Sequence, residues 1–160
     1  MGEPCPCQDN ILIVRSFALM DIVAVGNNNY KIKGKSASVG VSSDKIIIEQ
    51  VGKAAFTISE PGEYEVGGVS VLSFGSQTNV VEIDNLRIVF LGTEKPSDET
   101  ISEAGSIDIA VSVSIDIAKA VDPWIAVTTT EIAGVEALPK LSTTADKLPT
   151  DLQVVVLSTK

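Results

Sequence analysis

Short apolar runs alternate with turn-forming residues from about residue 20 to residue 91. Runs that are rich in Val and Ile and bounded by Gly, Asn, Asp or Pro are typical of β-strands. The pattern predicts strands at residues 22–25, 30–33, 36–41, 45–49, 55–58, 64–66, 69–74, 80–83 and 87–91. Because short turns separate consecutive runs, we expect this part of the chain to form an antiparallel meander.

Three connections in this meander carry the residues of tight hairpin turns. Gly34-Lys35 and Gly67-Gly68 predict two-residue turns, and Asp84-Asn85-Leu86 predicts a third hairpin. Glu60-Pro61-Gly62 is a further turn, with Pro and Gly in sequence.

The pattern changes after Gly92, where helical and strand-like stretches alternate. Ser97 followed by Asp98 and Glu99 indicates a helix N-terminus, because Ser caps a helix and acids favour its first turn. We predict helices at residues 97–103, 114–121 and 130–138, and strands at residues 107–113, 124–127 and 154–157. Such alternation implies parallel strand pairing.

The length of 160 residues and a hydrophobic content of 44% indicate one folded domain. We place it at residues 20–160, with residues 1–19 as an N-terminal extension on which folding does not depend. Residues 11–25 are apolar but are interrupted by Arg15 and Asp21, so they fall short of a membrane span. The start of the chain has no positive charge, unlike a signal peptide. We expect a soluble cytoplasmic protein.

The net charge of −9 bears on the partners of the chain. Phosphate binding needs clustered Lys and Arg, so the charge argues against nucleic acid as a partner. It also argues against binding to an anionic membrane surface. The excess of acidic residues is expected mainly to favour solubility.

The chain contains no histidine, which restricts its chemistry more than any other feature of the composition. A Ser-His-Asp triad, a Cys-His pair and a histidine-ligated zinc site are all excluded. The two cysteines, Cys5 and Cys7, are too few for a closed zinc site within one chain. We interpret them as incidental thiols, with a redox or intermolecular metal role as the alternative. We expect no cofactor.

Several motifs, in order along residues 21–160, resemble those of small predicted zinc-dependent hydrolases of the metallo-β-lactamase fold. The opening stretch 26–34 is similar to the Gly-His-Ser-x-Phe-x-Ile-x-Gly of that family. The other matching stretches are residues 61–69, 79–92, 105–110, 122–127 and 146–156. The resemblance implies an αββα sandwich, here trimmed, with two mixed β-sheets and outer helices.

The chain departs from this family at its metal ligands. Asn27 stands where the family has its first histidine, and Thr93 stands where an Asp follows Leu-Gly. The last histidine falls near Thr128 or Thr129. The His-x-His-x-Asp-His run is missing from the short interval between Val41 and Pro61. A catalytic zinc needs about three ligands, so we assign no catalytic, cofactor or metal residues.

The remaining polar residues offer weaker candidates. Glu60, Glu63 and Glu65 could bind Mg²⁺ or Ca²⁺, but a solvated strand face explains them better. Acid–base pairing of Asp108 with Asp116 would need a cleft that the sequence does not show. The run from Thr128 to Thr130, with Glu131, is explained as a helix cap. The hydroxyls of Ser73, Ser76 and Thr78 have no base partner in a chain without histidine. Trp124 is expected in the core.

We therefore expect an α/β protein that is not an enzyme but a structural or binding module. The alternatives are a hydrolase with an oxygen-ligated metal and an unrelated β-rich interaction domain. Self-association as a homo-oligomer is a further expectation. Its candidate surface is the strand at 45–49, whose consecutive Ile residues would either pair with a second copy or lie inside the sandwich.

Overall fold

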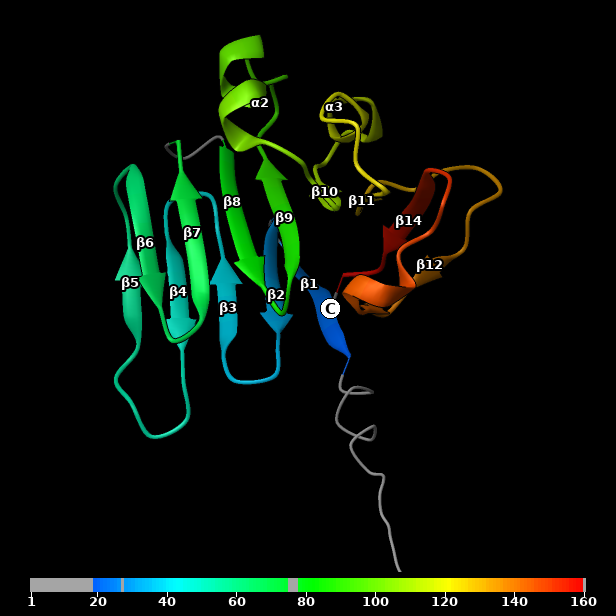
Figure 1. The fold of residues 1–160 in the computed structure, drawn as a ribbon. Coiled ribbons are helices and arrows are strands. Elements are labelled where there is room, and N and C mark those ends of the chain that lie inside the picture. The colour runs from blue at the N-terminus through cyan, green and yellow to red at the C-terminus, as the bar shows by residue number, and fades with distance from the viewer. Residues whose placement is uncertain (1–18, 27, 75–77, 160) are drawn as a thin grey trace, which may run out of the picture.

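The chain folds into two β-sheets that pack face to face, with few helices (Figure 1). The computed structural model describes residues 19–26, 28–74 and 78–159. The first sheet has the strand order β13-β1-β2-β3-β4-β5, and every pairing in it is antiparallel. Its strands are β1 (Met20–Gly26), β2 (Asn29–Lys33), β3 (Ser38–Val41), β4 (Ile46–Glu49), β5 (Phe56–Ile58) and β13 (Leu141–Thr143).

The second sheet is mixed and has the order β12-β14-β11-β10-β9-β8-β7-β6. The hairpin strands of this sheet are antiparallel, whereas β9, β10, β11, β14 and β12 run parallel to one another. The strands are β6 (Gly62–Val66), β7 (Val69–Ser73), β8 (Thr78–Ile83), β9 (Leu86–Leu91), β10 (Ile109–Val111), β11 (Ile125–Thr128), β12 (Ala137–Leu138) and β14 (Gln153–Leu157).

The main core lies between the sheets and follows the period of two that strands impose. In β9, Ile88 and Phe90 point into this core, whereas Val89 points to the opposite face. The opposite face carries a second apolar cluster beneath α2 (Asp98–Ala104) and α3 (Ile115–Lys119). Strands β9 to β11 are therefore buried on both faces, which explains their mostly apolar sequences.

Arg87 on β9 holds the end of α2 in place. Its guanidinium donates to the backbone oxygens of Ser106 and Ala104, and it forms an ion pair of 3.0 Å with Glu82. The positive group lies at the C-terminus of the helix, where it is favoured by the exposed carbonyls. The predicted N-cap is confirmed, because the Ser97 hydroxyl accepts from the backbone N–H of Thr100 at 3.2 Å.

Two of the three predicted tight turns are confirmed. Gly67 and Gly68 have φ of 57° and 86°, and Asp84 and Asn85 have φ of 53° and 66°. Positive φ at both central residues is the requirement of a type I′ hairpin turn. The turn at Gly34-Lys35 is longer than predicted: β2 ends at Lys33, β3 begins at Ser38, and the Gly34 N–H donates to the carbonyl of Ala37.

The helix predicted at residues 130–138 is wrong. Those residues form turns and the short strand β12, and residues 141–143 form β13, which the pattern did not predict. Gly134 takes φ of 84°, which lies outside the helical region, and the Thr130 hydroxyl donates to the carbonyl of Val113, 17 residues earlier in the chain. A 3₁₀ turn, η2 (Ala145–Lys147), follows β13.

The expected stacking of two sheets is confirmed, but the expectation that both are mixed is wrong. The pairings between the strands of the first sheet are all antiparallel, since it is built from consecutive hairpins closed by β13, and a parallel bridge from Ala24 to Thr159 stands outside these strand pairs. Helices α2 and α3 pack on the second sheet (Figure 1). The predicted extension at 1–19 falls almost wholly outside the described residues.

The strand predicted at 45–49 lies inside the first sheet rather than at its edge. β4 pairs with β3 on one side and β5 on the other, and Ile46 and Ile48 are buried between the sheets. The interior alternative therefore holds for those two residues, whereas Ile47 is partly exposed on the outer face. In the described part of the chain, every helix is too short or too polar to cross a membrane.

Candidate functional site

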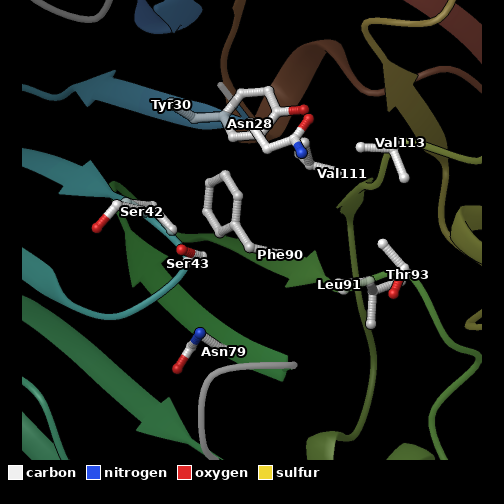
Figure 2. A pocket seen from close by; sticks show the side chains of 12 residues that line it. Asn28, Tyr30, Ser42, Ser43, Asn79, Phe90, Leu91, Thr93, Val111 and Val113 are labelled. Carbon is white, nitrogen blue, oxygen red and sulfur yellow. The ribbon is translucent and has the colours of Figure 1, made fainter. Parts of the chain in front are cut away.

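A cavity of about 400 Å³ opens between the two sheets at one end of the sandwich (Figure 2). It lies where β9 and β10 end and where β3 turns into β4. Ligand sites in α/β proteins form in this position, outside the carboxyl ends of parallel strands. The lining residues are Asn28, Tyr30, Val41, Ser42, Ser43, Asn79, Phe90, Leu91, Gly92, Thr93, Val111 and Val113.

Strand register brings the walls of the cavity together. In the second sheet, Asn79 pairs with Phe90, and Phe90 pairs with Val111. In the first sheet, Tyr30 pairs with Val41. Paired residues point to the same face of a sheet, so these two rows oppose each other across the sandwich. Residues from distant parts of the chain therefore form one site.

Tyr30 and Phe90 connect the rows through their rings, whose centroids are 5.6 Å apart at an angle of 44°. Tyr30 is only 6% exposed, and its hydroxyl is buried without a hydrogen-bond partner of normal geometry. Burial raises the pKa of Tyr30, while the side chain of Thr129 approaches closely enough to oppose that rise. The Thr129 side chain therefore lies near the Tyr30 hydroxyl without forming a hydrogen bond of normal geometry with it.

Asn79 provides a second buried polar group in the wall. It is 7% exposed, and its side-chain oxygen accepts a hydrogen bond of 2.6 Å from Ser73 Oγ. This bond orients the amide, since an Asn amide has one acceptor oxygen and one donor nitrogen. Figure 2 shows the amide nitrogen turned toward Ser43 and the cavity.

The mouth of the cavity is polar. Asn28, Ser43 and Thr93 are exposed there, and Asn28 has φ of 62° in the turn between β1 and β2. Ser42 is occupied by its own turn, because its hydroxyl lies 3.0 Å from an Asp44 oxygen and 3.1 Å from the Lys45 carbonyl.

Two threonines hold the loop beside the mouth. The Thr128 and Thr130 hydroxyls both donate to the carbonyl of Val113, at 3.0 Å and 2.7 Å. These bonds tie the segment after β11 to the segment after β10. The threonine run thus fixes the shape of the cavity rim, instead of capping a helix as predicted.

The cavity lining, in the part of the chain that the structure describes, contains no Asp, Glu, Lys or Arg. Serine and threonine hydroxyls need an adjacent base to act as nucleophiles, and the cavity offers them none. Tyr30 stays protonated near neutral pH because its pKa is raised. The arrangement can therefore pack against and hydrogen-bond a molecule, but it has no ionisable group suited to proton transfer at neutral pH.

The acidic candidates lie away from this cavity. Glu60, Glu63 and Glu65 are all exposed, as expected of a solvated surface. Asp108 and Asp116 stand at opposite ends of β10, so they do not form a pair. The Asp108 carboxylate accepts a hydrogen bond of 2.9 Å from the backbone N–H of Arg87. Within the described ranges, no group of three or more Cys, Asp or Glu side chains could hold a metal ion.

The other candidates have mixed outcomes. Ser73 and Thr78 are buried, and Ser73 binds Asn79 at the cavity wall. Trp124 was expected in the core, but it is 46% exposed because it precedes β11 at the surface end of the strand. Cys5, Cys7 and Ser76 lie outside the described residues.

Two of the positions that the resemblance equates with metal ligands lie in or near the cavity wall. Thr93 lines it, and Thr129 approaches Tyr30. Asn27 lies outside the described residues. The short interval that lacks the His-x-His-x-Asp-His run starts after Val41. Val41 and Ser42 both line the cavity.

Sequence reasoning missed Tyr30, Asn79 and Phe90, which define the cavity. One signal was present: Asn79 occupies an inward position in a strand whose other inward residues are Val81 and Ile83. An inward polar residue in such a strand needs a partner, which is a mark of a site.

Comparison of the chain with family models, curated proteins and solved structures finds no match.

Proposed function

We propose that this chain is a non-catalytic binding module that holds a small molecule in the cavity between its sheets. The observation that carries the proposal is a cavity of about 400 Å³ lined by apolar and uncharged polar side chains. Small-molecule sites have volumes of about 300–1,000 Å³ and combine apolar walls with a few placed polar groups.

The proposal includes descent from the metallo-β-lactamase fold. Two stacked sheets are consistent with that origin, and Thr93, where the resemblance would put a metal ligand, lines the cavity. A pocket that had lost its metal and kept its walls would have this composition. Sites for Ca²⁺ and Mg²⁺ are built on carboxylates, and the described lining of the cavity contains none.

The test is an NMR titration of the labelled protein with a fragment library of mixed charge. We expect at least one fragment to shift backbone signals that cluster around the cavity, at Asn28, Val41, Phe90 and Val113. Replacing Val113→Trp at the rim should block these shifts. The matched control is Val25→Trp, which places the same bulk on the exposed outer face, where Val25 is 47% exposed.

Three results would contradict the proposal. Shifts that are absent, or that survive Val113→Trp, would exclude the cavity as the site. Hydrolysis of ester or lactam substrates in the presence of Mg²⁺ or Mn²⁺, lost in Val113→Trp, would favour the alternative hydrolase. Stoichiometric capture of another protein through an outer face, with an empty cavity, would favour an interaction domain.

A further inference from the structure

The cavity wall presents two polar side chains that are each more than nine-tenths buried. Tyr30 is 6% exposed and Asn79 is 7% exposed, and they come from opposite sheets. Buried polar groups are normally hydrogen-bonded, and an exception calls for an explanation. The Tyr30 hydroxyl is such an exception among the described residues.

An aromatic surface lies between these two groups. Figure 2 shows Phe90 between Tyr30 and Asn79, and Val41 and Val111 extend the same walls through strand pairing. The rings of Tyr30 and Phe90 both belong to the cavity wall and contact each other with centroids 5.6 Å apart. Aromatic rings also pack preferentially against other rings in offset or edge-to-face arrangements.

The two buried polar groups of the wall can both donate a hydrogen bond to a ligand. Ser73 takes the side-chain oxygen of Asn79, which leaves the Asn79 amide nitrogen toward the cavity. The Tyr30 hydroxyl is buried without a hydrogen-bond partner of normal geometry among the described residues, and Tyr30 lines the same cavity. Asn28 is exposed at the mouth of this cavity.

The absence of charge around the described cavity sets the ligand charge. A carboxylate or ammonium group placed there would lose its hydration without meeting an opposite charge, which is strongly unfavourable. An uncharged acceptor such as a carbonyl oxygen loses much less and regains hydrogen bonds from the wall.

We infer that the cavity takes an uncharged, flat ring compound that packs on Phe90 and carries a carbonyl-type acceptor for Asn79, with Tyr30 as a second donor. This inference rests on the proposed function, because it names the ligand class of the same cavity. Asn79 and Tyr30 are then specificity-determining residues: they distinguish a ring with an acceptor from a purely apolar ring.

The test uses four probes that differ in one property each: benzamide, benzoate, toluene and cyclohexanecarboxamide. Affinities are measured by NMR titration of the full chain. Benzamide should bind at least tenfold more tightly than benzoate, because only benzoate brings an unpaired charge. It should also bind several-fold more tightly than cyclohexanecarboxamide, which has the same amide on a ring that is not flat.

Two variants connect this selectivity to the wall. Asn79→Leu should weaken benzamide about tenfold and leave toluene unchanged, since only the acceptor loses its donor. Toluene binding also reports whether the variant has kept its fold. Tyr30→Phe should weaken benzamide several-fold while keeping the ring contact with Phe90. Tyr64→Phe is the matched control, because the Tyr64 hydroxyl binds the Glu60 carbonyl at 2.9 Å on the surface.

The outcomes separate this inference from the proposed function. If charged or non-planar fragments occupy the cavity as well as benzamide does, the ligand class is wrong but the binding cavity stands. If benzamide binds equally to Asn79→Leu, Tyr30→Phe and the unmodified chain, the assigned donors are wrong. If no fragment of any kind shifts the cavity signals, both proposals fail.

Discussion

At the scale of single residues, Tyr30 is the least well satisfied polar group in the described structure. A buried hydroxyl without a partner destabilises a fold by about 1–3 kcal/mol. Such a residue is retained at a cost in stability, which is typical of positions that serve a ligand. Tyr30 therefore allows two predictions that do not require the ligand to be known.

Tyr30→Phe is expected to stabilise the protein without ligand, by about 1 kcal/mol, because it removes the unsatisfied hydroxyl and keeps the ring contact. Urea denaturation measures the difference in the free energy of unfolding. Tyr64→Phe should not stabilise, since its hydroxyl is bonded. A Tyr30→Phe protein less stable than the unmodified chain would show that Thr129 forms a full hydrogen bond.

The raised pKa of Tyr30 predicts a loss of stability in alkali. The unfolded chain releases this proton near the ordinary pKa of about 10, whereas the folded chain holds it to a higher pH. The free energy of unfolding is therefore unaffected by this group below about pH 10, and it falls as the pH rises from there through the folded pKa of Tyr30. Thermal melts across this range should fall more steeply for the unmodified chain than for Tyr30→Phe. Parallel curves would contradict the burial of the hydroxyl.

At the scale of secondary structure, strand alternation decides what each apolar residue does. Residues 45–49 contain three consecutive Ile residues, and sequence alone left open whether both faces are covered. The register places Ile46 and Ile48 in the core between the sheets and leaves Ile47 on the outer face. Neighbouring residues of one type thus have opposite surroundings.

This difference predicts opposite effects of two adjacent substitutions. Ile48→Ala should lower the free energy of unfolding by about 2–5 kcal/mol, because it opens a space in a packed core. Ile47→Ala should lower it by less than about 1 kcal/mol, since the side chain is already partly exposed. Equal losses in the two urea curves would mean that the outer face is covered, as a dimer through that face would require.

The C-terminal elements show where local signals fail. The stretch 130–138 has an apolar spacing that fits a helix, yet its first residues are taken by hydrogen bonds to Val113 and Thr128. The bond to Val113 is tertiary, because it joins residues that are 17 apart in the chain, so no local rule could include it. The strand β13 is equally hidden, because it is short and pairs with β1, more than a hundred residues earlier.

At the scale of the whole molecule, the two sheets make a site that neither could make alone. Tyr30 and Val41 come from the antiparallel sheet, and Asn79, Phe90 and Val111 come from the mixed sheet. Asp84 adds a link between the sheets, since its side chain accepts from the Lys35 N–H at 2.9 Å. The cavity therefore depends on how the sheets stack.

The whole chain is predicted to hold well under one zinc ion per molecule when purified without chelator. The reason is its composition: it has no histidine and only two cysteines, too few for a closed site. Elemental analysis of the protein measures this directly. Cys5→Ser combined with Cys7→Ser is the control for metal held by the thiols. One zinc per chain that survives both substitutions would contradict the prediction.

The sequence by itself determined the strands between residues 20 and 91, the tight turns at Gly67-Gly68 and Asp84-Asn85 and the capped helix α2, because these depend on neighbouring residues. It also determined the exclusion of histidine chemistry, which depends only on composition. Only the tertiary structure decided the burial of the Tyr30 hydroxyl and the meeting of Tyr30 with Phe90. It also decided the course of residues 130–143. The physical reason is the same in each case: the groups involved meet across the sandwich, or across connections between distant strands, and no local pattern encodes which residues will face one another.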